Sequence, residues 1–141
     1  MKLLFVCRGN VARSQMARAF YEKYSGLKAE AAGTGKRTHE KQGEKIKDIP
    51  EAEFVIRCMK EEGLDLSERF RSPLTPEKVN GADKIIIMAE KETIPDYLTN
   101  SSKTIYWEFD DPLGATYENT RRVRDEIKSK VLELIKTENR E

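Results

Sequence analysis

Isoleucines occupy positions 85–87 without interruption, and this run constrains the fold more than any other apolar segment. A continuous β-branched run is typical of a strand that is covered on both faces, as in parallel sheets flanked by helices. We therefore expect a strand within residues 82–88. Three other short apolar segments are also predicted to be strands: Lys2–Val6, Leu27–Ala32 and Lys103–Trp107.

Amphipathic segments alternate with these strands. Apolar side chains recur every four positions in residues 13–24, which predicts a helix that stops near Gly26. A second helix is expected over residues 50–62, because Pro50 can open it and Gly63 can end it. The remaining helical predictions are a short piece at residues 95–98 and a C-terminal helix with Val123, Ile127, Val131 and Ile135 on its apolar face. The polar stretch 36–48 fits neither pattern.

Strands that alternate with helices predict an α/β fold with right-handed crossovers. We expect a three-layer sandwich, in which a four-stranded parallel sheet carries helices on both faces, formed by a single domain over residues 1–141. A chain of this length can bury one hydrophobic core. Ligands of such sheets bind at the carboxyl ends of the strands. The residues expected at that edge are Cys7, Thr34, Met88 and the segment 108–111.

Composition narrows the possible functions. The net charge is +1 with 36% charged residues, and acids and bases are interspersed, which argues against a nucleic-acid-binding arm. No segment approaches the length and hydropathy of a membrane span. Two cysteines and one histidine, His39, predict neither a disulfide framework nor a zinc cluster. The simplest expectation is a protein of the reducing cytoplasm.

The segment directly after the first strand carries the most informative chemistry: Cys7-Arg8-Gly9-Asn10-Val11-Ala12-Arg13-Ser14. A thiol at the end of a strand would face the positive end of the following helix, where oxyanions bind and thiolates are favoured. Backbone N–H groups of the turn could surround an anion, and Gly9 permits unusual dihedrals there. Arg13 could donate two hydrogen bonds to the remaining oxygens of a phosphate.

A phosphate monoester in this loop could be attacked by Cys7 to give a phosphocysteine. Ser14 could donate a hydrogen bond to the sulfur and ease its departure in a second step. The leaving oxygen would need an acid, and candidates occur at Asp110 and Asp111 before Pro112. Proline restricts the preceding residue, which could hold the Asp111 carboxylate over the loop. Either aspartate could instead cap the C-terminal segment.

Residues 5–17 resemble the active-site signature of the low-molecular-weight protein tyrosine phosphatases, which thioredoxin-coupled arsenate reductases share. The resemblance continues in family order through four further motifs: Ala32-Gly33-Thr34, Gly63-Leu64-Asp65-Leu66-Ser67, Ile87-Met88 and Asp111-Pro112. It therefore covers essentially the whole chain. The family fold that it implies is a four-stranded parallel sheet flanked by helices, with no metal or organic cofactor.

The resemblance also implies roles for individual residues. Cys7 would be the nucleophile, Arg13 the phosphate clamp and Ser14 the partner of the thiolate. Asn10 would hold the strained backbone of the loop, and Asp111 would be the general acid. The substrate would be a phosphorylated protein or a small aryl phosphate. Its phosphate, or another oxyanion, would lie in the loop formed by Arg8, Gly9, Asn10, Val11, Ala12, Arg13 and Ser14.

Three departures from the family pattern affect these expectations. Ala12 replaces a cysteine that is common before the loop arginine, so a protective disulfide with Cys7 is unavailable. Residues 85–96 contain none of the cysteines that relay electrons in the reductases. Residues 113–115 replace the aromatic side chains that usually follow the Asp-Pro pair. We therefore expect a phosphatase, with an arsenate reductase using an external thiol, or an inactive oxyanion- or phosphoprotein-binding module, as alternatives.

Several residues have competing interpretations. Cys58 is expected to pack in the core rather than act in redox chemistry, and His39 is expected at the surface. Arg8 could add positive charge to the loop or simply be solvated. Tyr117 and Trp107 could line the substrate rim, although Trp107 could equally belong to the core.

Overall fold

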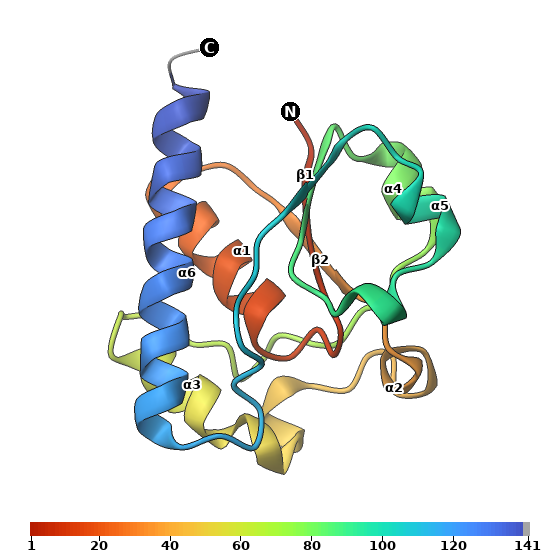
Figure 1. The fold of residues 1–141 in the computed structure, drawn as a ribbon. Coiled ribbons are helices and arrows are strands. Elements are labelled where there is room, and N and C mark those ends of the chain that lie inside the picture. Colours follow the sequence, from red (N-terminus) through yellow and green to blue (C-terminus); the bar gives the residue numbers. More distant parts are fainter. Residues whose placement is uncertain (140–141) are drawn as a thin grey trace.

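The computed structural model describes residues 1–139 and contains a four-stranded sheet in which every neighbouring pair is parallel. The strand order is β2-β1-β3-β4, and the strands are β1 (Leu3–Cys7), β2 (Glu30–Gly33), β3 (Lys84–Ile87) and β4 (Thr104–Tyr106). Helices cover both faces of this sheet (Figure 1), so the predicted α/β fold is confirmed.

Side chains of β1 enter two different cores, because successive residues of a strand point to opposite faces. Leu3 and Phe5 enter the larger core. Its helices are α1 (Arg13–Ser25), α3 (Glu53–Lys60) and α6 (Tyr117–Glu138). Leu4 and Val6 enter the second core on the other face. Its helices are α4 (Pro76–Gly81) and α5 (Asp96–Thr99).

The carboxyl ends of the strands lie close together because of their register. Cys7 pairs with Gly33 of β2, and Val6 pairs with Ile87 of β3. The short helix α2 (Lys36–Glu40) follows β2 and lies beyond this edge (Figure 1). The predicted strands and the predicted long helices are present, with boundaries shifted by a few residues.

Local differences from the predictions have simple causes. The strand predicted from Leu27 begins only at Glu30, because Leu27 N and Ala29 N donate to the side chains of Ser25 and Glu22. The helix predicted from Pro50 begins with a 3₁₀ turn over Pro50–Ala52 before α3. The unassigned stretch 36–48 contains α2 and a 3₁₀ turn, Ile46–Asp48.

The C-terminal helix α6 packs mainly against α1, as Figure 1 shows. Its buried residues Val123, Ile127, Val131 and Ile135 are those predicted to form its apolar face. Trp107, left open between core and rim, is buried and packs beside Phe5 and Phe109. Within residues 1–139, no helix combines the length and apolar character needed to cross a bilayer.

Candidate active site

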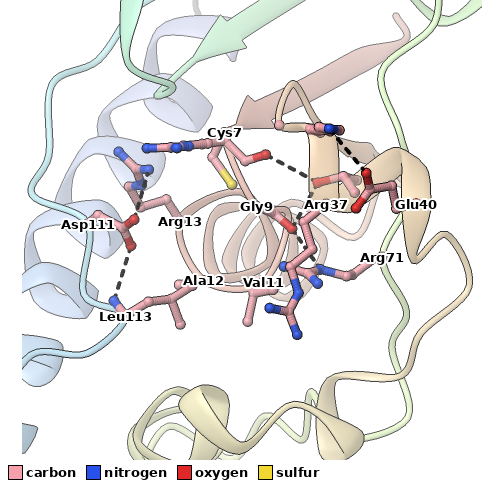
Figure 2. A pocket seen from close by; sticks show the side chains of 14 residues that line it. Cys7, Gly9, Val11, Ala12, Arg13, Arg37, Glu40, Arg71, Asp111 and Leu113 are labelled. Atoms are coloured by element: carbon pink, nitrogen blue, oxygen red, sulfur yellow. Dashed lines mark hydrogen bonds and ion pairs between the residues drawn. The ribbon is translucent and has the colours of Figure 1, made fainter. Parts of the chain in front are cut away.

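A cavity of about 460 Å³ opens at the carboxyl end of β1, around the loop that joins β1 to α1. Figure 2 shows the Cys7 side chain in this cavity, with Arg13 and Asp111 on one side and Arg37 and Arg71 on the other. The neighbouring strand ends are tied to β1. Thr34 N donates to Cys7 O at 2.9 Å, and Met88 N donates to Val6 O at 2.7 Å. The predicted meeting of Cys7, Thr34 and Met88 at one edge is confirmed.

A chain of hydrogen bonds with a fixed direction ends at the Cys7 sulfur. Ser72 N donates to Asn10 Oδ1 at 2.8 Å, which fixes the orientation of the Asn10 amide. Asn10 Nδ2 then donates to Ser14 Oγ at 2.8 Å. The Ser14 hydroxyl, already accepting from Asn10, can donate its own hydrogen to Cys7 Sγ, 3.0 Å away. The side chains of Asn10, Ser14 and Cys7 are buried, so water does not compete for these hydrogen bonds.

Asn10 holds the loop in a conformation that few side chains tolerate. Its φ is 54°, which makes it the sole non-glycine residue with positive φ among residues 1–139. Gln15 adds a second restraint, because its Nε2 donates to Asn10 O at 3.2 Å and to Phe70 O at 3.2 Å. The strained turn is thus fixed by a helix residue and by the distant Phe70–Ser72 segment.

Hydrogen bonds from two distant side chains hold carbonyl groups of the loop, and several of its N–H groups keep no protein acceptor among residues 1–139. Arg71 Nε donates to Gly9 O at 3.1 Å, and Thr38 Oγ1 donates to Arg8 O at 3.2 Å. The C=O and N–H of one peptide unit point in opposite directions. Asn10 N accordingly donates to Cys7 Sγ at 3.2 Å. In the part of the chain that the structure describes, the N–H groups of Gly9, Val11 and Ala12 donate to no protein acceptor.

Arg13 is almost fully buried and spans the ends of two strands. Its Nη1 donates to Met88 O at 2.7 Å and lies 2.8 Å from Glu90 Oε1. Nη2 lies 3.7 Å from Asp111 Oδ2. Burial disfavours the charged guanidinium, but the negative charges of Cys7 and the two carboxylates outweigh it and raise the pKa of Arg13.

The two candidate acids have different surroundings. Asp111 lines the cavity, and its Oδ1 accepts a hydrogen bond from Leu113 N at 3.1 Å in a short turn. Asp110 is exposed, and its Oδ2 pairs with Arg122 Nη2 at 2.8 Å instead. Geometry therefore favours Asp111 over Asp110 as the carboxyl group nearest the loop.

The walls of the cavity are basic and lack aromatic rings. Arg8, Lys36, Arg37 and Arg71 line it alongside Arg13, against two carboxylates, Glu40 and Asp111. Tyr117, a candidate for the rim, instead packs edge-on against Phe54, with the Arg57 guanidinium 4.4 Å from its ring centroid. Of the residues that follow Pro112, Leu113 lines the cavity.

Two further residues from the sequence lie outside the cavity. Cys58 is buried in the larger core, and burial raises the pKa of its thiol to about 11. His39 is exposed, as expected. Arg8, by contrast, is exposed and lines the cavity, so it adds to the positive charge there.

Glu90, Thr38 and Arg71 contribute to the site and were not found from the sequence. Glu90 follows β3, so the rule that sites lie at strand ends could have identified it. Arg71 contacts a loop that is 62 positions away in sequence, and nothing local distinguishes it from Arg69. Thr38 lies in the polar stretch that fitted no pattern.

Comparison with known protein families gives one match that spans the chain. The family profile described as low molecular weight phosphotyrosine protein phosphatase matches residues 2–141. An arsenate reductase of Brevibacillus brevis is 30% identical to this chain over 136 residues, which cover 96% of this chain and 94% of the relative.

Solved structures with the same fold include a tyrosine phosphatase and an arsenate reductase. The low molecular weight protein tyrosine phosphatase from T. tengcongensis is 26% identical, with a TM-score of 0.74 over 97% of this chain and 99% of that one. An arsenate reductase in the phosphate binding state is 25% identical, with a TM-score of 0.77 over 96% of this chain and 97% of that one. The chain thus belongs to the low molecular weight phosphotyrosine protein phosphatase family.

Proposed function

We propose that this protein hydrolyses phosphate monoesters, with phosphotyrosine and small aryl phosphates as substrates, through a phosphocysteine at Cys7. The observation that carries the proposal is the directed chain from Ser72 through Asn10 and Ser14 to the Cys7 sulfur. A hydrogen bond to sulfur stabilises the thiolate both as attacking group and as leaving group.

In the first step, the Cys7 thiolate attacks phosphorus while the bond from phosphorus to the ester oxygen breaks. The loop N–H groups and Arg13 hold the three remaining oxygens, where negative charge concentrates. Asp111, in its protonated form, gives its proton to the departing oxygen. The products of this step are the free alcohol or phenol and a phosphocysteine.

In the second step, the Asp111 carboxylate accepts a proton from a water molecule as the water oxygen attacks phosphorus. The sulfur–phosphorus bond breaks, and the electron pair returns to sulfur as thiolate, stabilised by the Ser14 hydroxyl. Inorganic phosphate then leaves. Because Asp111 is protonated again, the cycle closes without any cofactor.

Arsenate reduction is the second candidate, and the names of the similar curated proteins favour it. Arsenate has the charge and geometry of phosphate, so the same loop could bind it. The whole chain has two cysteines, and Cys58 is buried on α3. The electrons would therefore have to come from an external thiol. A reducing, cytoplasmic setting suits either activity, because both need a free Cys7 thiol.

The two activities can be separated by assaying the wild-type protein and Cys7→Ser with p-nitrophenyl phosphate, phosphotyrosine peptides and arsenate. We expect hydrolysis by the wild type and none by Cys7→Ser. Turnover of arsenate with glutathione or thioredoxin, together with no ester hydrolysis, would refute the phosphatase proposal. Phosphate binding without any turnover would instead indicate a binding module.

The role of Asp111 has a separate signature. Asp111→Asn should slow hydrolysis of esters with poor leaving groups by roughly 10²–10⁴-fold, the usual contribution of a general acid. Esters with good leaving groups need little protonation and should be affected much less. Asp110→Asn is the matched control and should change neither rate substantially. An equal loss on both ester types in Asp111→Asn would assign this carboxylate a structural role.

A further inference from the structure

A second groove begins on the far side of Arg13, and we call it the β3–β4 groove. Its walls are Met88–Glu92, which follow β3, and Tyr106–Phe109, which end β4 and follow it. It has a volume of about 820 Å³. Arg13 lines both this groove and the Cys7 cavity, so the two hollows meet at one side chain.

The groove combines accessible aromatic surface with negative charge. Tyr106 is 47% exposed on the edge strand, and Phe109 is half-buried. Glu92 and Glu108 are exposed, and neither forms an ion pair among residues 1–139. Among the described residues that line the groove, Lys91 is the single cation besides Arg13, whose charge is matched by Glu90.

The Cys7 cavity has the opposite polarity. Arg8 and Arg37 line it without an ion-pair partner among residues 1–139. The other basic side chains of the cavity, Arg13, Lys36 and Arg71, pair with glutamates. A substrate that reached from one hollow into the other would meet positive charge around its phosphate and negative charge beyond Arg13. Complementary charge selects partners and speeds association even where it adds little affinity. An exposed tyrosine ring beside carboxylates also attracts cations through its π face.

We propose that the β3–β4 groove binds the polypeptide next to the phosphorylated residue and selects a flank that carries a lysine or arginine beside an aromatic or long aliphatic side chain. This inference rests on the proposed phosphatase function for its substrate. It adds a specificity surface that lies outside the cavity of the nucleophile. The aliphatic or aromatic side chain packs on Tyr106 and Phe109, and the basic group pairs with Glu92 or Glu108.

The test uses phosphotyrosine peptides that differ only in the residues on one flank, Lys-Leu in one and Glu-Ser in the other. The wild-type protein should hydrolyse the basic peptide with about tenfold higher kcat/KM at low ionic strength, and added salt should reduce this ratio. The preference should appear on one side of the phosphotyrosine and not on the other. Equal kcat/KM for both peptides, with either flank varied, would overturn the proposal.

Reversing the charge of the groove carboxylates tests whether they cause the preference for a basic flank. The double variant Glu92→Lys and Glu108→Lys should abolish or invert the preference, while Glu133→Lys, an exposed carboxylate on α6, should leave it intact. Tyr106→Thr keeps a strand-forming residue and should weaken selection of the Leu side chain. A p-nitrophenyl phosphate molecule bound at Cys7 is too short to extend into the groove. The rate of its hydrolysis should therefore stay within about twofold of the wild-type rate in all variants. A preference that survives the double variant would contradict the proposal.

The experiments distinguish a wrong proposal about the groove from a wrong proposal about phosphatase activity. Hydrolysis of p-nitrophenyl phosphate without a flank preference refutes the groove alone. If no ester is hydrolysed, fluorescence anisotropy of the same labelled peptides with Cys7→Ser still tests the groove. Binding must then favour the basic flank and must lose this preference in the charge-reversed background; otherwise the proposal is wrong.

Discussion

Arg13 is a single side chain that ties together the carboxyl ends of two strands. Its Nη1 atom is occupied by Met88 O and by Glu90, so the guanidinium cannot rotate freely. Burial would raise the pKa of Glu90, but the hydrogen bond and charge of Arg13 lower it below its usual value. Glu90 therefore stays ionised, and it both orients Arg13 and offsets its charge.

Removing the charge of Glu90 should change how tightly the loop holds an oxyanion. In Glu90→Gln, the guanidinium keeps Met88 O as an acceptor but loses a competing negative charge. We expect inorganic phosphate to inhibit more strongly, with an inhibition constant lower by roughly fivefold, the scale expected for a nearby charge. Inhibition of p-nitrophenyl phosphate hydrolysis measures this. Glu92→Gln is the control, and unchanged or weaker inhibition in Glu90→Gln would contradict this role.

The two cysteines should differ sharply in reactivity. Because the pKa of Cys58 is about 11 and its side chain is buried, it stays a neutral thiol at pH 8. Iodoacetamide at this pH should label Cys7 in the native protein, and Cys58 only after denaturation. Mass spectrometry of the digested protein identifies the labelled peptide. Labelling of native Cys58 at a rate similar to Cys7 would show that the core around α3 opens.

The residues of the site differ in how far they could be predicted. Cys7 and Arg13 follow from a local pattern, because a strand, a turn and a helix are contiguous in sequence. Asp111 was preferred to Asp110 from its place before Pro112 and from the family resemblance. The structure adds that Asp110 pairs with Arg122, whereas Asp111 lines the cavity. Glu90 could have been found because it follows β3. Arg71 contacts a loop 62 positions away in sequence, and no local pattern marks it.

Among the elements, β2 ends at Gly33, where there is no space for a side chain because the loop between β1 and α1 packs against it. A Cβ atom on Gly33 would lie 2.7 Å from Thr38 Oγ1 and 2.8 Å from Arg8 O. These two atoms form the hydrogen bond that ties the loop to Thr38. The strand β2 therefore supports the geometry of the loop although it provides no side chain to it.

Gly33→Ala should consequently damage both stability and the site. Overpacking of this kind costs about 1–3 kcal/mol in the free energy of unfolding, and phosphate binding should weaken as the loop shifts. Gly81→Ala is the matched control, because its Cβ would meet nothing closer than 3.7 Å and its φ is not positive. Urea denaturation and phosphate titration measure the two effects. Equal stability of the two variants would contradict the role of Gly33.

Elements were predictable where their patterns are long or strongly apolar. The isoleucine run predicted β3, and apolar side chains at every fourth position predicted α1 and α6. The short helix α4 was missed because it has six residues and one buried side chain, Val79. Its signals are a proline at its start and the Thr75 side chain, which accepts from Lys78 N, and such caps also occur in turns.

For the whole molecule, the parallel sheet with β1 at its interior explains why the residues of the site lie together at the carboxyl ends of the strands. The loop after β1, the segments after β3 and β4, and the turn before α2 all lie beyond the same strand ends. Alternation of strands and helices predicted this edge, but not the strand order or the β3–β4 groove. Both depend on which strands pair, which a single sequence does not specify.

The role of Cys7 as nucleophile is tested most sharply by stopping the reaction with p-nitrophenyl phosphate rapidly in acid and mapping phosphate on the protein by mass spectrometry. One phosphoryl group is expected on the peptide that contains Cys7, and it should accumulate further in Asp111→Asn, where hydrolysis of the phosphocysteine is slower. No adduct should form in Cys7→Ser. Ester hydrolysis at full rate by Cys7→Ser, or a phosphoryl group found only on another residue, would contradict the assignment of Cys7 as the nucleophile.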